Sequence, residues 1–361
     1  MKKDRPLCTT RAGTEWRNEL NRYAKIALSL LLIGVISLCA SAQTVTLNGA
    51  GATFPYPIYS KWFNEYHKVH SNIQINYQSI GSGGGIRQLT EGTVDFGASD
   101  GPMTDEQLSE AKSKTSLTIL HIPTVLGAAV PAYNIAGVTQ ELKFTPDVLA
   151  GIFLGKITKW NDPALAKANP GVKFPDQQIV VAHRSDGSGT TYIWTDYLSK
   201  VSPEWEKKVG RNTSVKWPVG NGGKGNEGVA GLIRQIPGSI GYIELIYAVQ
   251  NKIPYGSVQN AAGVFVKASL ESTTAAAATA KMPADFRVSI TNAPGKSAYP
   301  IASFTWLLIP VQSKDPAKGK ILKDFLVWML DKGEPMVSEL TYAPLPKQVS
   351  TMVSKQVQQI R

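Results

Sequence analysis

One pattern recurs in the first part of this chain and constrains its fold: a short strand, a loop of small residues and then a helix. Apolar residues alternate over residues 44–47 and again over residues 73–77, which is the spacing of a half-buried strand. The small-residue loops 49–54 and 81–85 follow these two strands. Strands that alternate with helices are typical of an α/β fold with a largely parallel sheet. We therefore expect an α/β protein.

The same alternation continues through the rest of the chain. Residues 104–107 (TDEQ) have the form of a capping box, which predicts that a helix begins there. Residues 303–309 are a strongly apolar run of strand length. The other predicted elements are strands over 94–97 and 179–182 and helices over 58–69, 86–91, 146–154, 191–198, 229–235 and 322–330.

The N-terminal segment has the form of an export signal. Seven basic residues precede the apolar run 26–38, and Ala40-Ser41-Ala42 has the small-x-small form of a signal peptidase site. The run has 13 residues, whereas a membrane-spanning helix needs about 20. We expect residues 1–42 to be a signal peptide cleaved after Ala42. Acylation of Cys39 is the alternative, but Leu38 is bulkier than such sites prefer.

Removal of this segment changes the charge and the cysteine content. The whole chain has 38 basic and 27 acidic residues, and cleavage leaves 31 and 24. Both cysteines, Cys8 and Cys39, are lost, so the mature chain has no disulfide and no thiolate ligand for a metal. We find no dense basic run with interleaved aromatic residues, so we expect no nucleic-acid partner. The sequence thus predicts an exported, soluble protein.

Four loops share one chemical character: residues 49–54, 81–85, 97–101 and 184–190. Each follows a predicted strand and is rich in Gly, Ser, Thr or Asp. In an open α/β sheet, ligands bind beyond the carboxyl ends of the strands, where the next helix presents free N–H groups. Any one loop alone is better explained as a tight turn with a helix cap. Together with Arg184, whose guanidinium suits a tetrahedral oxyanion, the four loops predict an anion site.

Several other motifs do not carry a cofactor or metal prediction. The spacing Gly220-x-Gly222-x-x-Gly225 matches a dinucleotide fingerprint, but the segment before it contains Pro218 and is a poor buried strand. No phosphate-binding P-loop motif occurs. The pair His67 and His70 could suit a metal by its spacing, yet no third ligand is evident, so a solvated helix end is the better interpretation. We expect no cofactor and no metal.

One enzyme signature remains as an alternative. Residues 97–101 fit G-x-S-x-G, the nucleophile elbow of serine hydrolases, with Ser99 as the nucleophile. The elbow needs a helix directly after the serine, and Pro102 delays it here. Neither His121 nor His183 has an evident triad context. We therefore expect no catalytic residues.

The chain resembles a known family in several long strings: GAGATFPYP, GSGGGIRQL, TVDFGASDGPMT, IFLGKITKW, RSDGSGTTYIW, VKWPVGNGGKGNEGVA and PGSIGY. These strings are similar to the periplasmic phosphate-binding proteins (PstS family) of Pst-type ABC importers, occur in the family's order and cover nearly all the mature chain. The resemblance implies a type II periplasmic-binding-protein fold with two α/β lobes and a ligand cleft between them. Lobe I would comprise residues 43–126 and 300–361, and lobe II residues 127–299.

The resemblance also implies a set of site residues. Asp186 would pair with the site arginine and orient it, and the Phe54 contact would be its backbone N–H. The family often has a second serine where this chain has Gly83, which puts one contact in doubt. The implied phosphate contacts are Thr53, Phe54, Ser82, Asp100, Arg184, Ser188, Gly189 and Thr190.

Asp100 would provide the selectivity of such a site. Phosphate near neutral pH still carries a proton that a carboxylate can accept, whereas sulfate carries none and would be repelled. The resemblance further implies hinge closure on phosphate by a monomer, followed by docking on a membrane permease with a separate ATPase. A binder of another tetrahedral oxyanion, such as sulfate or molybdate, is the second alternative beside the hydrolase.

Overall fold

The computed structural model describes residue 22 and residues 44–361. The predicted cleavage position at Ala42 and the alternative acylation residue Cys39 lie outside the described residues. Residues 45–361 form one compact unit, which is described by itself here.

The main sheet of this unit has eight strands in the order β2-β1-β3-β11-β4-β8-β6-β7. At one end β1 pairs parallel with β2 and β3, and at the other β6 pairs parallel with β7 and β8. The centre is antiparallel, so the expected parallel sheet is found only at the two ends. The strands are β1 Val45–Gly51, β2 Ile73–Ser79, β3 Phe96–Ser99, β4 Ile119–Asn134, β6 Val180–Arg184, β7 Asn221–Gly223, β8 Ser239–Glu244 and β11 Ala302–Pro310.

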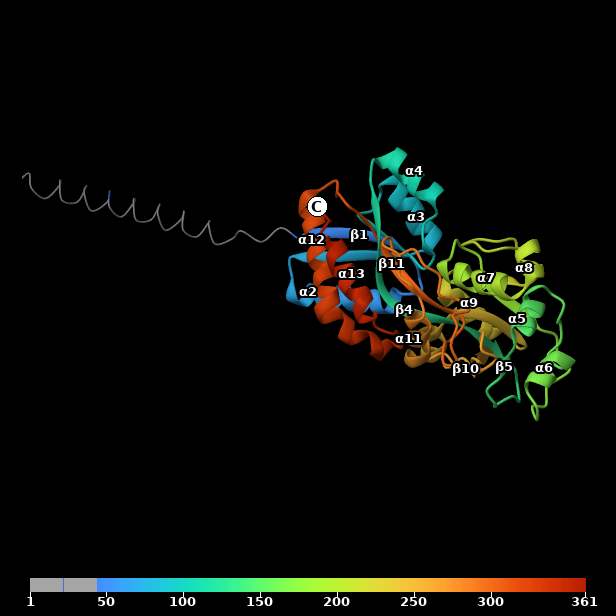
Figure 1. Cartoon of the computed structure of the whole chain (residues 1–361). Coiled ribbons are helices and arrows are strands. Elements are labelled where there is room, and N and C mark those ends of the chain that lie inside the picture. Colours follow the sequence, from blue (N-terminus) through green and yellow to red (C-terminus); the bar gives the residue numbers. More distant parts are fainter. Residues whose placement is uncertain (1–21, 23–43) are drawn as a thin grey trace, which may run out of the picture. The chain divides into compact units, whose positions relative to one another are not determined.

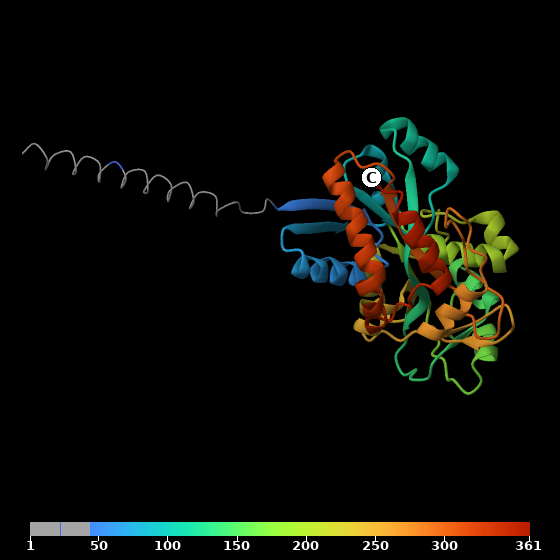
Figure 2. The same ribbon diagram turned by 60° about the vertical axis from the view of Figure 1, so that its left-hand side comes forward.

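Strand β4 connects the two parallel ends of the sheet. Its residues 119–128 pair with β11, and its residues 129–134 pair with β8. β4 and β11 run together through the middle of the molecule, between the part with β1 and α12 and the part with α7 and α9 (Figures 1 and 2). All but the last of the 16 residues of β4 are buried, so the period-two alternation that would predict a strand is absent. This strand was accordingly not predicted from the sequence.

The helices confirm most of the predicted segments. In the capping box, Thr104 Oγ1 accepts from the Gln107 N–H at 3.2 Å and Gln107 Oε1 accepts from the Thr104 N–H at 3.0 Å. Helix α3 begins at Ser82, earlier than predicted, because the glycines predicted as loop form its first turn. The helices are α2 Tyr56–Val69, α3 Ser82–Glu91, α4 Asp105–Thr115, α5 Pro146–Phe153, α6 Pro163–Ala168, α7 Gly189–Val201, α8 Pro203–Lys208, α9 Gly225–Gln235, α10 Leu245–Gln250, α11 Leu270–Ala278, α12 Pro316–Trp328 and α13 Lys347–Val357.

Smaller elements complete the unit. A second sheet has the order β10-β9-β5, and α12 continues into a π-helical turn and a 3₁₀ helix. Among the described helices, none combines the length and the apolar character needed to cross a membrane. The added elements are β5 Lys143–Phe144, β9 Ser257–Gln259, β10 Phe265–Val266, η2 Met329–Gly333 and η3 Glu334–Leu340.

Candidate functional site

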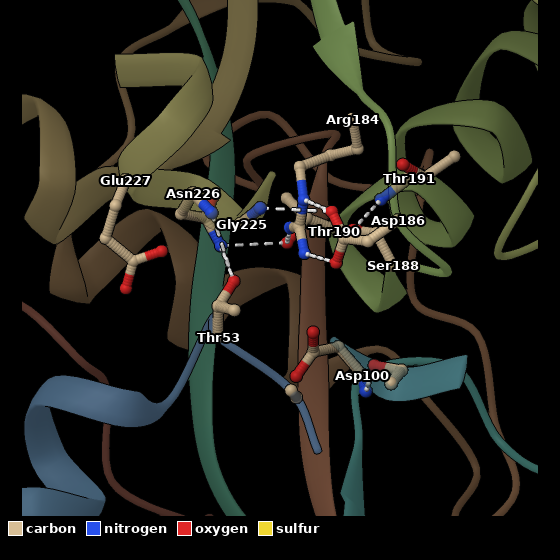
Figure 3. A network of polar contacts seen from close by, with 12 residues as sticks. Thr53, Asp100, Arg184, Asp186, Ser188, Thr190, Thr191, Gly225, Asn226 and Glu227 are labelled. Carbon is tan, nitrogen blue, oxygen red and sulfur yellow. Dashed lines mark hydrogen bonds and ion pairs between the residues drawn. The ribbon is translucent and has the colours of Figure 1, made fainter. Parts of the chain in front are cut away.

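The four loops selected from the sequence meet in one place. Thr53 follows β1, Ser82 opens α3, Asp100 follows β3, and Arg184 ends β6 just before the start of α7. The side chains of Thr53, Asp100, Arg184 and Thr190 converge there (Figure 3). All of them are at most 3% exposed. The predicted anion site is thus a buried cluster of polar side chains. Burial of such groups costs free energy unless hydrogen-bond partners compensate for the lost contacts with water.

The first turn of α7 contributes three of the predicted site residues. Ser188 is the N-cap of this helix, and its Oγ accepts from the Thr191 N–H at 3.0 Å. No hydrogen bond among the described residues uses the N–H of Gly189 or Thr190. These N–H groups therefore remain available at the positive end of the helix dipole. Such a helix start favours an anion.

The hydroxyl groups of the site act as acceptors within the protein. Ser82 Oγ accepts from the Asp100 N–H at 3.2 Å. Thr190 Oγ1 accepts from Arg184 Nη1 at 3.3 Å, and Thr53 Oγ1 accepts from the Asn226 N–H at 3.2 Å. Within the described residues, none of these hydroxyls donates its own proton to a protein acceptor. Each can therefore donate to a bound acceptor.

Arg184 is held by Asp186, as the resemblance implied. Its Nε donates to Asp186 Oδ1 at 2.8 Å and its Nη2 to Oδ2 at 2.6 Å. The Gly225 N–H also donates to Asp186 Oδ1, at 3.0 Å. Burial by itself raises the pKa of Asp186, but these hydrogen bonds and the guanidinium charge lower it below its usual value. The pair fixes the guanidinium plane and leaves one N–H on Nη1 and one on Nη2 for a ligand.

Asp100 is the exceptional group of the site. Its Oδ1 accepts from the Thr305 hydroxyl at 2.7 Å, while its buried Oδ2 has no hydrogen-bond partner among the described residues. Burial raises the pKa of Asp100 to about 7, against smaller lowering effects of Thr305 and Arg184. The site therefore presents one unsatisfied acceptor amid several unused donors.

Glycines allow these loops to approach closely. A Cβ on Gly189 would lie 2.5 Å from both Asp100 Oδ2 and Ser82 Oγ, so no side chain fits there. The N–H of Gly83 donates to the Gly187 carbonyl at 2.8 Å. This N–H is already used in a contact between two loops, which answers the question left open at Gly83. Phe54 is fully buried, and its carbonyl accepts from the Tyr342 hydroxyl at 2.6 Å.

Two contacting residues escaped the sequence analysis. Asn226 donates through Nδ2 to Thr53 Oγ1 at 2.7 Å and to Thr190 Oγ1 at 3.2 Å. It directly follows Gly225, the last glycine of the dinucleotide-like spacing, and lies in the first turn of α9; this glycine-rich segment was the available signal. Thr305 was included in a strand predicted from its apolar run. A hydroxyl residue within such a strand was the only hint of its contact with Asp100.

The geometry does not support the hydrolase alternative. The Ser99 hydroxyl donates to the Gly101 carbonyl, and the side chain is fully buried. His121 Nε2 accepts from the Met103 N–H at 3.0 Å, and burial lowers the His121 pKa to about 4. His183 stacks on Trp217 with ring centroids 4.9 Å apart. Ser99 therefore has no histidine base in the described structure.

The histidine pair lies at the end of α2, with His67 in its last turn and His70 at its C-cap. His67 Nδ1 lies 2.6 Å from the Ile73 carbonyl oxygen, so this ring nitrogen is used within the protein. The described residues contain no group of three or more His, Cys, Asp or Glu side chains that could hold a metal ion.

Comparison with known proteins gives a consistent result. The family model described as a PBP superfamily domain matches residues 39–332. The chain is 47% identical to the phosphate-binding protein PstS of Pasteurella multocida, over 91% of this chain and 94% of that protein. It is 49% identical to the PstS protein of Xylella fastidiosa, over 84% and 82% respectively.

The solved structures agree on the fold. A phosphate-binding protein from Stenotrophomonas maltophilia superimposes with a TM-score of 0.67 at 19% identity, over 86% of this chain and 94% of that one. The α/β periplasmic-binding-protein fold expected from the sequence is therefore confirmed. The relatives are named as binding proteins, which excludes the enzyme reading. With the matched model and these identities, the chain belongs to the PstS family of phosphate-binding proteins.

Proposed function

We propose that this protein captures inorganic phosphate in the periplasm and delivers it to the membrane permease of an ABC importer. One observation carries the proposal: the buried Asp100 Oδ2 is an acceptor with no partner among the described residues, and the same site holds hydroxyl groups whose protons no described acceptor uses. A ligand that satisfies this site must have several oxygen acceptors and one proton to give. Phosphate near neutral pH meets both requirements.

The donors assigned to phosphate come from four places: the loop after β1, the start of α3, the end of β6 and the start of α7. Arg184 offers two N–H groups, and the N–H groups of Gly189 and Thr190 point from the start of α7. Phe54 donates through its backbone in this proposal. The hydroxyl donors are Thr53, Ser82, Ser188 and Thr190.

Selectivity follows from the carboxyl group of Asp100. Phosphate donates its proton to Oδ2, and the resulting hydrogen bond satisfies an oxygen that is otherwise buried and unpaired. Sulfate has no proton at neutral pH, so its oxygen would face a carboxylate at close range. Molybdate would meet the same repulsion. The function of a phosphate importer is therefore favoured over that of a general oxyanion binder.

Capture and release require that the site opens. In this proposal residues 43–126 with 300–361 form lobe I and residues 127–299 form lobe II. The lobes close about β4 and β11, the strands that run between the two parallel ends of the sheet. The closed complex docks as a monomer on the permease, and a separate ATPase drives transport. The signal peptide 1–42 places the protein in the periplasm and is removed after Ala42.

Calorimetric titration tests the proposal directly. The chain from residue 43 is stripped of bound anion by unfolding and refolding, and is titrated with phosphate and then with sulfate at about pH 8.5, where Asp100 is ionised and phosphate still carries a proton. We expect tight one-to-one binding of phosphate and no heat with sulfate. Equal binding of the two anions would refute the role of Asp100. A folded protein that binds neither anion would refute the function.

A further inference from the structure

Asn226 is a fully buried amide that joins three parts of the site. It lies in the first turn of α9, and its Nδ2 donates to Thr53 Oγ1 at 2.7 Å and to Thr190 Oγ1 at 3.2 Å (Figure 3). On its other side, Oδ1 accepts from the Glu244 N–H at 2.9 Å. These contacts use both donors and one acceptor of the amide.

The Glu244 N–H fixes the direction of this amide. A backbone N–H can only donate, so it must face the oxygen of the Asn226 side chain. The opposite orientation would place the amide NH₂ against that N–H. The nitrogen of Asn226 therefore faces the two threonine hydroxyls, and both of its hydrogens are donated to them.

This direction determines what the threonine hydroxyls can do. Thr53 Oγ1 accepts twice from Asn226, through the backbone N–H and through Nδ2. Thr190 Oγ1 accepts once from Asn226 and once from Arg184 Nη1. A hydroxyl oxygen has two lone pairs and one proton. Both lone pairs are used on each threonine, so only the proton remains for a ligand.

We propose that Asn226 is a positioning residue that commits the hydroxyls of Thr53 and Thr190 to donate to the bound anion. The inference rests on the proposed function and deepens it. At this end the site accepts only ligand oxygens that carry no proton, because neither hydroxyl can accept one. The proton of the ligand is thereby directed to Asp100. Asn226 thus sets the orientation in which a protonated oxyanion binds.

A double-mutant cycle on anion affinity tests this role. In the native protein, Thr53→Val removes a hydrogen bond to a charged ligand and should weaken phosphate binding about 10- to 100-fold. Asn226→Asp retains an oxygen for the Glu244 N–H but replaces the nitrogen with an acceptor. The hydroxyls then donate to the introduced carboxylate rather than to the anion, so Thr53→Val should cost less than about threefold in this background.

The negative charge added by Asn226→Asp lowers the affinity of both proteins that carry it. It therefore cancels from the factor by which Thr53→Val weakens binding in this background. If Asn226 only holds the loops together, Thr53→Val will weaken binding by the same factor in both backgrounds. That result would overturn the inference. Asn226→Ala, which removes one of the two bonds to Thr53 Oγ1 and keeps the backbone one, should give an intermediate factor and serves if the aspartate variant does not fold.

Asn169 provides a matched control. It is a buried asparagine whose Oδ1 accepts from the Lys143 N–H at 2.7 Å and whose Nδ2 donates to two carbonyls at 2.9 Å. Asn169→Asp disturbs a similar buried amide away from the site residues. The cost of Thr53→Val should stay at its native value in this background. A reduced cost here would mean that general destabilisation causes the coupling, and would overturn the inference.

Failure of the inference and failure of the proposed function are distinguishable. If the native protein binds sulfate rather than phosphate, the proposed selectivity is refuted. The cycle is then measured with sulfate, whose oxygens also accept from both threonines. An equal effect of Thr53→Val on sulfate affinity in both backgrounds would again overturn the role of Asn226. If the native protein binds neither anion, both the function and the inference are overturned.

Discussion

Replacement of Asp100 by asparagine should remove a pH-dependent loss of stability from the ligand-free protein. Burial raises the pKa of Asp100 from 3.8 to about 7, and the side chain is only 1% exposed. Between these values the folded protein holds a proton that the unfolded chain has released. Stability therefore falls as the pH rises from about 4 to about 7. At about 1.4 kcal/mol per pKa unit the full effect is about 4 kcal/mol.

About two thirds of this effect falls between pH 5 and pH 8, which is a convenient range for measurement. In Asp100→Asn the carbonyl oxygen can still accept from the Thr305 hydroxyl, and no charge is buried at any pH. We therefore expect the difference in the free energy of unfolding, variant minus native, to increase by about 3 kcal/mol from pH 5 to pH 8.

Urea unfolding of both proteins, stripped of anion, measures this difference at the two pH values. Burial also raises the pKa of Glu244 well above its usual value and that of Glu334 to about 8. Both groups are present in the two proteins, and the charge of Asp100 is the smallest of the influences on the pKa of Glu244, so their contributions largely cancel in the comparison. Parallel pH profiles would refute the reasoning, because they would mean that the carboxyl group of Asp100 ionises as easily in the folded as in the unfolded state.

Three further predictions concern single side chains. Gly189→Ala places a Cβ 2.5 Å from Asp100 Oδ2 and should abolish phosphate binding by calorimetry, whereas Gly231→Ala, where the Cβ meets nothing within 4 Å, should leave it unchanged. Thr305→Val removes the one hydrogen-bond partner that the Asp100 carboxyl group has among the described residues, and it should weaken phosphate binding about tenfold; an unchanged affinity would contradict the role given to this hydroxyl. Glu334→Gln should raise the melting temperature at pH 9 but not at pH 5, and an equal gain at both would exclude ionisation as its cause.

The loops of the candidate site could be selected from the sequence because their signals are local. Loops of glycine and hydroxyl residues directly after strands meet at one edge of a sheet when the strands are parallel. Thr53, Ser82 and Asp100 meet for this reason, since β1 pairs parallel with β3 and α3 begins close to both. Arg184 and Asp186, two residues apart, form the pair that the family resemblance implied.

The residues that were missed depend on contacts between distant parts of the chain. Asn226 lies 173 residues from Thr53, and Thr305 lies 205 residues from Asp100. The contact of Thr305 with Asp100 exists because β11 pairs with β3, whereas the contact of Asn226 with Thr53 joins the two ends of the sheet. The continuous burial of β4 hid it from an analysis based on alternation. The pairing between long buried strands determines which polar residues come into contact. This pairing cannot be predicted from the local spacing of residues in the sequence.

The charges of the site explain why donor direction matters so much in this protein. Arg184 carries the one positive charge described among the site residues, and Asp186 already pairs with it. Asp100 adds a negative charge whenever it ionises. The site itself is therefore neutral or negative, and a bound anion gains little from net charge there. Its affinity must come from oriented N–H and O–H groups, which are strong in a buried site that excludes water. A binding site of this kind recognises where the ligand's proton lies, because one wrongly directed hydroxyl leaves two buried groups unpaired.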